Sequence, residues 1–316
     1  MAGRAMTHWL PCQPTATTTM NRRDLFRAST ASALMAALPR IGDAAVPATV
    51  APALAPPAQG PIDVAFLLSD GAVLIDFTGP WEVFQNVMIP GRDDGPLFRL
   101  FTVAETTAPI KAGGSMTITP EYTFATAPPP QIVVIPAQGG PSPAAIAWIR
   151  EAARTAALTM SVCTGAFVLA KTGLLSGKRA TTHHGSFRQF AMEFPDVHLA
   201  RGARFVESGK FASAGGLSSG IDLALRVVER YFGRTVARNT ANVLEYQGQG
   251  WLDPMSNRAY ARRRTASGAH PLCPVCEMEV DKATAATSTY RRRTYYFCMA
   301  EHKTAFDAGP MGFLGG

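Results

Sequence analysis

The chain has 316 residues, 47% hydrophobic and 17% charged, a composition typical of a folded globular protein. Its formal net charge is +7, of which residues 1–60 contribute +3 through five Arg against two Asp, so the remainder carries +4. That remainder includes the Arg runs at 262–264 and 291–293, which are typical of solvated surfaces, and we expect no nucleic-acid partner. Five cysteines are an odd number, which argues against a disulfide framework.

Residues 1–60 are expected to be a leader. Residues 21–27, Asn-Arg-Arg-Asp-Leu-Phe-Arg, resemble a twin-arginine export signal, and an apolar segment and an Ala/Pro-rich tract follow. The sequence Ala53-Leu54-Ala55 fits a small-x-small cleavage site, and Met20 offers an alternative start. We therefore expect a periplasmic protein, exported already folded by the twin-arginine machinery, with a mature N-terminus between residues 44 and 60. The alternative is a disordered basic tail.

From residue 61 onward, apolar runs alternate with helical patterns. This alternation predicts an α/β fold in which helices cover both faces of a parallel sheet. Expected strands cover 62–68, 98–103, 131–135 and 158–162, with a short strand at 116–119, a strand beginning at Ala180 and a hairpin around Ser208-Gly209. Expected helices begin at Trp81, behind Pro80 in the first helical position, and cover 143–157, 164–172 and 218–232.

Cys163 stands where an apolar strand gives way directly to a helical pattern of small residues beginning at Gly165. A thiol at that turn faces the free N–H groups of the helix start, which favour the thiolate. We therefore expect a reactive cysteine whose pKa lies below the value of about 8.5 for a free thiol. The alternative is a small buried hydrophobic residue, a common environment for free cysteine.

Four marked positions fall at the carboxyl ends of expected strands, where such sheets bind ligands. They are Asp76, the pair Gly139-Gly140, Cys163 and His183. The Gly139-Gly140 amides, with the Thr164 N–H, are candidates for an oxyanion hole and substrate-binding site. Asp76 is the candidate acid–base group, with a helix-start role as its alternative. The competing carboxylate is Glu82, while His184 and His198 are expected to be ordinary histidines.

Two stretches carry a resemblance to a known family. Residues 76–84, Asp-Phe-Thr-Gly-Pro-Trp-Glu-Val-Phe, and 161–183, around Ser-Val-Cys-Thr-Gly-Ala-Phe, resemble the ThiJ/PfpI family of the class I glutamine amidotransferase-like superfamily. The similarity is to its isonitrile hydratase branch and to the ligand domains of AraC-type regulators, and residues 214–225 resemble the same branch. It implies a flavodoxin-like three-layer sandwich over 61–247, expected as a homodimer.

In isonitrile hydratases the matching positions make Cys163 the nucleophile, Asp76 the acid–base group and Thr164 a helper, with no cofactor. The expected reaction converts an isonitrile into an N-substituted formamide. Protease-like members carry His directly after the cysteine, where this chain has Thr164, so peptidase activity is not expected. Two further interpretations stay open: a periplasmic metal or ligand sensor or delivery protein without catalysis, and a stress-type hydrolase that acts on reactive carbonyls.

After a polar linker expected over 248–269, residues 270–316 contain Cys273-x2-Cys276 and Cys298-x3-His302. These four side chains form a ligand set suited to tetrahedral zinc or copper(I). The segment resembles a YHS or TRASH-like metal domain, although His302 stands where many relatives have Cys and Cys273 where many have an acid. The alternative is a disulfide that joins Cys276 to Cys273 or Cys298.

Overall fold

The computed structural model describes residues 51–92, 95–261, 266–268 and 270–314. The twin-arginine pair Arg22-Arg23 and the alternative start Met20 lie outside these residues. Within the described ranges, no helix combines the length and the apolar character needed to cross a membrane.

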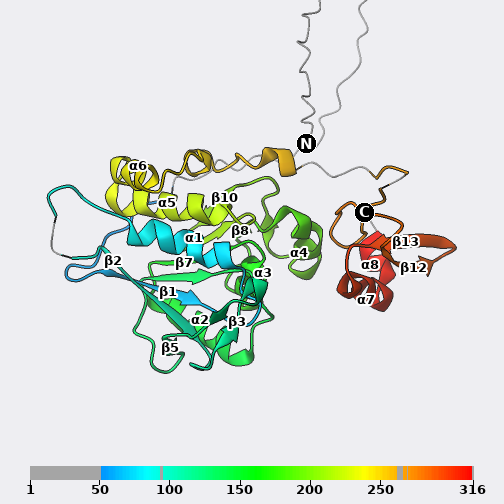
Figure 1. Cartoon of the computed structure of the whole chain (residues 1–316), viewed down its shortest axis with the longest axis horizontal. Helices are drawn as coiled ribbons and strands as arrows, with labels where there is room; N and C mark the ends of the chain where they lie inside the picture. Colours follow the sequence, from blue (N-terminus) through cyan, green and yellow to red (C-terminus); the bar gives the residue numbers. More distant parts are fainter. Residues whose placement is uncertain (1–50, 93–94, 262–265, 269, 315–316) are drawn as a thin grey trace, which may run out of the picture. The chain divides into compact units, whose positions relative to one another are not determined.

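A seven-stranded, mainly parallel sheet forms the centre of the main domain (Figure 1). Its strands are β1 (Ile62–Leu67), β2 (Phe98–Ala104), β5 (Tyr122–Thr123), β6 (Ile132–Ile135), β7 (Leu158–Val162), β10 (Phe205–Ser208) and β11 (Phe211–Ala214). They lie in the order β10-β11-β7-β6-β1-β2-β5. Neighbouring strands are parallel except β10 and β11, which form an antiparallel hairpin at one edge. The carboxyl ends of the parallel strands therefore share one edge of the sheet.

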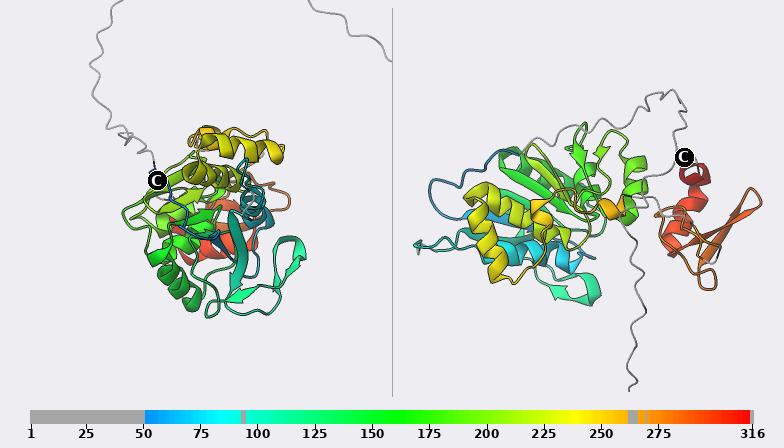
Figure 2. Two further views of the ribbon diagram at one scale, coloured as in Figure 1. Left: turned by 90° about the vertical axis from the view of Figure 1, so that its left-hand side faces the viewer. Right: turned by 90° about the horizontal axis from the view of Figure 1, so that it is seen from above.

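Helices cover both faces of this sheet (Figures 1 and 2). They are α1 (Leu74–Gln85), α2 (Pro143–Thr155), α3 (Gly165–Lys171), α4 (Phe187–Glu193), α5 (Ser219–Phe232) and α6 (Arg234–Val243). Alternate residues of β1 point to opposite faces: Val64 and Phe66 join the core beneath α1, α5 and α6, and Ala65 and Leu67 join the core beneath α2, α3 and α4. Burial on both faces explains the continuous apolar strand runs, and the expected α/β sandwich is confirmed.

Several elements differ from the sequence-based expectation. Helix α1 begins at Leu74 rather than Trp81, so Pro80 lies inside the helix and Asp76 in its first turn. The Val73 N–H donates to the Ala137 carbonyl (2.8 Å) and fixes the helix start against the end of β6. The expected strand from Ala180 is only β8 (Arg179–Ala180), which pairs with β9 (His198–Leu199) outside the main sheet. The expected short strand is β4 (Thr117–Ile118), paired with β3 (Ile110–Lys111). Helices α4 and α6 were not anticipated.

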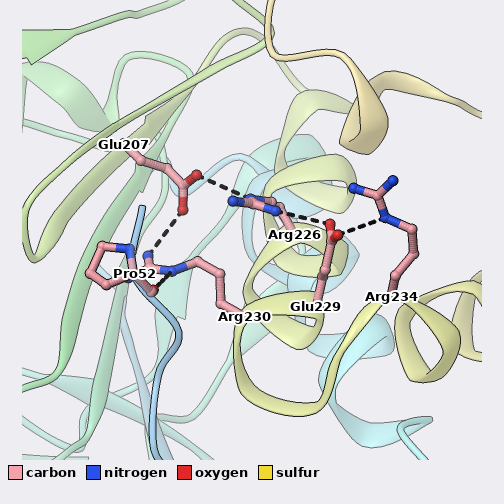
Figure 3. A network of polar contacts seen from close by, with 6 residues as sticks. All are labelled: Pro52, Glu207, Arg226, Glu229, Arg230 and Arg234. Atoms are coloured by element: carbon pink, nitrogen blue, oxygen red, sulfur yellow. Dashed lines mark hydrogen bonds and ion pairs between the residues drawn. The ribbon is translucent and has the colours of Figure 1, made fainter. Parts of the chain in front are cut away.

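An extended N-terminal segment, residues 51–55, is bound to α5 (Figure 3). The Arg230 Nε donates to the Pro52 carbonyl (2.9 Å), and the Leu54 N–H donates to the Arg230 carbonyl (2.9 Å). The Arg230 side chain is 3% exposed and also pairs with Glu207 (3.0 Å). The ion-pair network continues through Arg226, Glu229 and Arg234. The expected cleavage site Ala53-Leu54-Ala55 therefore lies in a segment that the folded domain holds.

Residues 248–261, expected to begin a linker, pack on the domain. They contain two short 3-10 helices, Gly250–Leu252 and Arg258–Tyr260. Trp251 is 4% exposed and joins the core beneath α5. The Arg204 N–H donates to the Pro254 carbonyl (2.7 Å). The folded domain therefore continues beyond residue 247, because burial of the Trp251 ring stabilises this segment.

A small module follows from residue 270. Strands β12 (Ala286–Tyr290) and β13 (Arg293–Phe297) form an antiparallel hairpin, followed by α7 (Ala300–Ala308) and α8 (Pro310–Leu314). Its buried core is composed of Cys273, Val275, Cys276, Val280, Phe297 and Phe306. A core this small contributes little stability by itself, so the cysteines within it are candidates for a stabilising cross-link or metal site.

Candidate active site and metal cluster

Cys163 occupies a sharp turn between β7 and α3. Its φ is 58°, in the left-handed region that costs a non-glycine residue about 1–2 kcal/mol. Three hydrogen bonds hold the backbone there. The Cys163 N–H donates to the Gly215 carbonyl (2.9 Å) and more weakly to Ala214 (3.2 Å), and the Thr182 hydroxyl donates to the Cys163 carbonyl (2.9 Å). The elbow expected from the sequence is confirmed, and it aims the thiol away from the strand.

Gly165 allows α3 to begin so close to the sheet. A Cβ atom at this position would lie 2.2 Å from the Ile135 carbonyl oxygen and 2.7 Å from that of Pro136. Backbone atoms cannot yield to such a contact, so glycine is required for the close approach of helix and strand. The first helical turn is thereby fixed beside the Cys163 sulfur.

Two backbone N–H groups approach the Cys163 sulfur, those of Thr164 and Leu217, and each favours the thiolate. Burial and the negative charge of Asp76 act more strongly in the opposite direction and raise the pKa of the Cys163 thiol to about 12. The expectation of a depressed pKa was therefore wrong for this structure. A seven-residue helix start does not outweigh the desolvation of a sulfur on a residue that is 8% exposed, next to a carboxylate.

Asp76 is the carboxyl group that the fold brings to Cys163. Asp76 is fully buried. Its Oδ2 accepts the Ala137 N–H (3.1 Å), and its carboxyl group hydrogen-bonds the Cys163 side chain. Burial raises the pKa of Asp76 to about 7, against the smaller opposing effects of these two hydrogen bonds. The competing carboxylate Glu82 is exposed and bonds Gln85 and Asn86 of its own helix. A protonated Asp76 is thus available near neutral pH as a proton donor.

His183 lies near Asp76 and Cys163, and within the described residues it makes no observed hydrogen bond to either side chain. Its Nδ1 accepts the Gly185 N–H (3.2 Å), and burial lowers the pKa of the ring. The ring is therefore neutral at pH 7, with its proton on Nε2. A Cβ atom at Gly216 would lie 2.3 Å from His183 Cδ2, so the ring packs directly against the backbone that leads to Leu217. A catalytic role for His183 stays a prediction.

The pair Gly139-Gly140 follows the end of β6, as expected. The Gly139 N–H donates to the Asp70 carbonyl (3.0 Å), so this amide is already engaged. Both glycines line a cavity of about 140 Å³ together with Ser69, Gln138 and Ser142, and neither Asp76 nor Cys163 lines it. The second amide at the sulfur is instead that of Leu217. The sequence signal for it is Gly215-Gly216, because the backbone before Leu217 passes too close to the His183 and Asn257 side chains to carry a Cβ atom.

In the C-terminal module, the four expected ligands converge. The candidate ligand atoms of Cys273, Cys276, Cys298 and His302 all lie within 4.8 Å of one another. The Cys276 and Cys298 sulfurs are 3.5 Å apart, and the His302 Nδ1 is 3.2 Å from the Cys298 sulfur. The three cysteines are free of disulfides, and a tetrahedron with metal–sulfur bonds of about 2.3 Å has sulfur separations of roughly 3.8 Å.

The surroundings of Cys273 also suit a metal. Backbone N–H groups of Val275, Cys276 and Cys298 hydrogen-bond its sulfur, and the Cys276 thiol adds the strongest contribution. These contacts lower the pKa of Cys273 to about 4. Metal thiolates commonly receive such hydrogen bonds in their outer shell. Cys273 is fully buried whereas Cys298 and His302 are partly exposed, so the cluster is reached from the side of those two residues.

A parallel α/β sandwich with a cysteine on a strand–helix elbow, paired with a buried carboxyl group, defines a class of proteins that hold a small molecule at the carboxyl edge of the sheet. The chain belongs to the DJ-1/PfpI family, whose model matches residues 63–230. The ThiJ/PfpI resemblance inferred from the sequence is thereby confirmed.

Two curated relatives differ in kind. Isonitrile hydratase from Pseudomonas putida is 29% identical over 195 residues, which cover 58% of this chain and 78% of that protein. The HTH-type transcriptional regulator GbdR from Pseudomonas aeruginosa is 25% identical over 204 residues, 63% of this chain and 54% of the regulator. The family therefore includes both an enzyme and regulators among the relatives of this chain.

Solved structures support the fold. A THiJ/PfpI family protein from Pseudomonas syringae matches with a TM-score of 0.53 at 23% identity, covering 68% of this chain and 84% of that chain. Drosophila melanogaster DJ-1beta matches with a TM-score of 0.52 at 18% identity, covering 60% of this chain and all of that chain. At these identities the likeness concerns the fold alone.

Proposed function

We propose that the main domain is a cysteine-dependent hydratase that converts isonitriles into N-substituted formamides. The observation that carries this proposal is the buried Asp76–Cys163 pair on the elbow. The reaction needs one nucleophile and one group able to deliver a proton near neutral pH, and the pKa of Asp76, raised to about 7, meets the second requirement. The similarity to isonitrile hydratase supports the same choice of substrate class.

In the first step the Cys163 sulfur attacks the terminal carbon of the isonitrile R–NC. A carbon–sulfur bond forms, the thiol proton passes to the Asp76 carboxylate, and Asp76 delivers a proton to the same carbon. The product of this step is the thioimidate R–N=CH–S. The Thr164 and Leu217 amides stabilise negative charge on the sulfur while the bond forms.

In the second step water adds to the thioimidate carbon. One water proton reaches the substrate nitrogen by way of Asp76, and the carbon–sulfur bond then breaks. The hydroxyl proton returns to the departing sulfur, which leaves R–NH–CHO. The net change is R–NC plus water to R–NH–CHO, with Asp76 and Cys163 restored.

The test is formamide production followed by proton NMR with methyl, cyclohexyl and benzyl isonitriles. Cys163→Ala is expected to give no formamide above the protein-free rate. Asp76→Asn is expected to reduce turnover by about 10²–10⁴-fold, the usual contribution of a positioned acid–base group. Glu82→Gln, a carboxylate on the exposed side of the same helix, is the matched control and should retain wild-type turnover. Formamide production that persists in Cys163→Ala would refute the proposed function.

A second candidate is a ligand-binding domain without catalysis. The similarity to GbdR and the burial of both Cys163 and Asp76 favour it. In that case glyoxals and isonitriles alike would stay unchanged, while turnover of glyoxals alone would identify a hydrolase of reactive carbonyls that uses the same thiol.

The module is proposed to hold one zinc or copper(I) ion through Cys273, Cys276, Cys298 and His302, in a YHS-like arrangement. A bound ion would join the turn at 273–276 to the end of β13 and to α7, segments that share only a small core. Export by the twin-arginine machinery and a homodimeric assembly remain parts of the proposal. Replacing Arg22 and Arg23 together by Lys should retain the protein in the cytoplasm, and mature protein in the periplasm of that variant would contradict export.

A further inference from the structure

Residues 250–261 are fixed against the domain at several points. A Cβ atom at Gly250 would lie 2.6 Å from Asp222 Oδ2, so this backbone lies directly on the buried carboxylate. A Cβ atom at Gly202 would lie 3.2 Å from the Arg258 Cα. Together with the buried Trp251 ring, these contacts hold the segment along its whole length. The segment follows the part of the chain that the family model matches, residues 63–230.

Arg204 anchors the segment from within the domain. Its guanidinium pairs with the fully buried Asp222 (2.5 Å), which also accepts the Tyr246 hydroxyl (3.0 Å). The Arg204 Nη1 donates to Asn257 Oδ1 (3.3 Å), and its Nη2 donates to the Ser218 hydroxyl (3.1 Å). The charge of Arg204 is therefore neutralised by Asp222, and the space beside it has no net charge from this pair.

Between the segment and the domain lies a cavity of about 160 Å³. Its walls are residues 182–184, 216–218 and part of 250–261. Two of these walls also hold the nucleophile: the Thr182 hydroxyl bonds the Cys163 carbonyl, and the Leu217 N–H bonds the Cys163 sulfur. Asn257 and Tyr260 of the segment line the cavity together with Thr182, His183, His184 and Leu217, and Cys163 lies behind Thr182 and Leu217.

The lining has a defined chemistry. Tyr260 stacks on His184 with ring centroids 4.7 Å apart and planes 23° apart, which makes a flat wall. The neutral ring of His183 carries its proton on Nε2, a hydrogen-bond donor, because Nδ1 accepts the Gly185 N–H. A cavity of about 150 Å³ can hold a benzene ring. The cavity thus suits a neutral, planar group of that size that carries a hydrogen-bond acceptor.

We infer that residues 250–261 form the specificity wall of the Cys163 site, with Tyr260 and Asn257 beside the substituent that the electrophile carries. This inference rests on the proposed function in taking Cys163 as the nucleophile, and it adds the class of substituent: a neutral ring with an acceptor atom. A flat aromatic wall favours stacking with such a ring.

The test compares alkylation of Cys163 by iodoacetamide and by N-benzyl-iodoacetamide, followed by intact mass at pH 9. Cys163→Ala identifies labelling at other cysteines. Tyr260→Ala is expected to lower the ratio of the benzyl to the parent rate about tenfold while the iodoacetamide rate stays within twofold. Tyr260→Phe, which keeps the ring, should retain the wild-type ratio. Ser256→Ala, an exposed position on the same segment, is the matched control.

An unchanged ratio in Tyr260→Ala would overturn the inference, as would a wild-type Cys163 that neither reagent alkylates, because the cavity would then not open to the sulfur. Isonitrile turnover separates this result from the proposed function. A changed ratio without turnover of any isonitrile would leave the specificity wall in place and remove the hydratase. Isonitrile turnover with an unchanged ratio of alkylation rates would support the hydratase and remove the specificity wall.

Discussion

Replacing Asp76 by Asn is expected to change the shape of the pH profile of thiol reactivity at Cys163. The two groups titrate as a pair, with the pKa of Asp76 raised to about 7 and that of Cys163 raised to about 12. A unit charge at roughly 4 Å is worth about 4 kcal/mol at an effective dielectric constant of 20, or about three pKa units. That figure is an upper limit, because burial is the larger cause of the raised pKa of Cys163 and remains in Asp76→Asn, so the pKa of the thiol should fall below about 12 and stay above about 9.

The same coupling fixes the wild-type behaviour. When the pair has lost one proton, the charge lies on the sulfur in about one molecule in a hundred at most, because the pKa of the sulfur beside a neutral Asp76, above about 9, exceeds the pKa of Asp76, about 7, by two units or more. The wild-type thiolate fraction should therefore stay at or below about 2% up to pH 10. In Asp76→Asn it should rise about tenfold per pH unit from pH 7 to at least pH 9, because the pKa of the thiol lies above about 9.

The assay is the second-order rate of iodoacetamide alkylation at Cys163 between pH 6 and pH 10. The two proteins should react within about threefold of each other at pH 7 and differ by about tenfold at pH 9, with Asp76→Asn the faster. Glu82→Gln should follow the wild-type curve. Parallel curves with the same midpoint in wild type and Asp76→Asn would refute the coupling on which this reasoning depends.

Three further predictions concern the scaffold and the module. Gly165→Ala should lower the free energy of unfolding in urea by about 3 kcal/mol, because its Cβ would meet the Ile135 carbonyl, whereas Gly140→Ala, with nothing within 4 Å of its Cβ, should change it little. Removal of residues 1–55 should destabilise the protein by about 3 kcal/mol relative to removal of residues 1–50, because Arg230 loses the Pro52 carbonyl and Leu54 leaves the core. Equal melting temperatures of the two truncated proteins would contradict this prediction. For the same reason we expect the leader to be cleaved upstream of Pro52. Anaerobically purified protein should contain about one zinc or copper ion per chain, which Cys276→Ser loses and Cys163→Ala retains. Metal-free protein with a mapped Cys276–Cys298 disulfide would show that the cluster is not a metal site.

Local pattern was sufficient for much of the fold and for the position of the elbow cysteine. Continuous apolar runs identify strands buried on both faces, and the change from a strand to a small-residue helix at Cys163–Gly165 identifies the elbow, because both signals depend only on neighbouring residues. The four metal-ligand candidates could be named in the same way from the spacing of Cys273, Cys276, Cys298 and His302.

Boundaries that depend on distant contacts were harder to predict. Pro80 indicated a helix start, yet α1 begins six residues earlier because the Val73 N–H binds the Ala137 carbonyl across the sheet edge. Residues 250–261 were expected to belong to a linker because they show no clear helix or strand periodicity, whereas the buried Trp251 fixes them to the domain. In both cases the deciding partner lies far away in the sequence.

The sequence by itself determined the alternation of strands and helices, the elbow cysteine and the presence of Asp76 at a strand end. Only the tertiary structure decided which groups face the sulfur: the Leu217 amide rather than that of Gly139, and Asp76 rather than Glu82. It also reversed the direction of the thiol pKa. The helix start that favours a thiolate is a local feature, whereas the burial and the neighbouring carboxylate that oppose it arise only when β7, α1 and the loop at Leu217 are packed together.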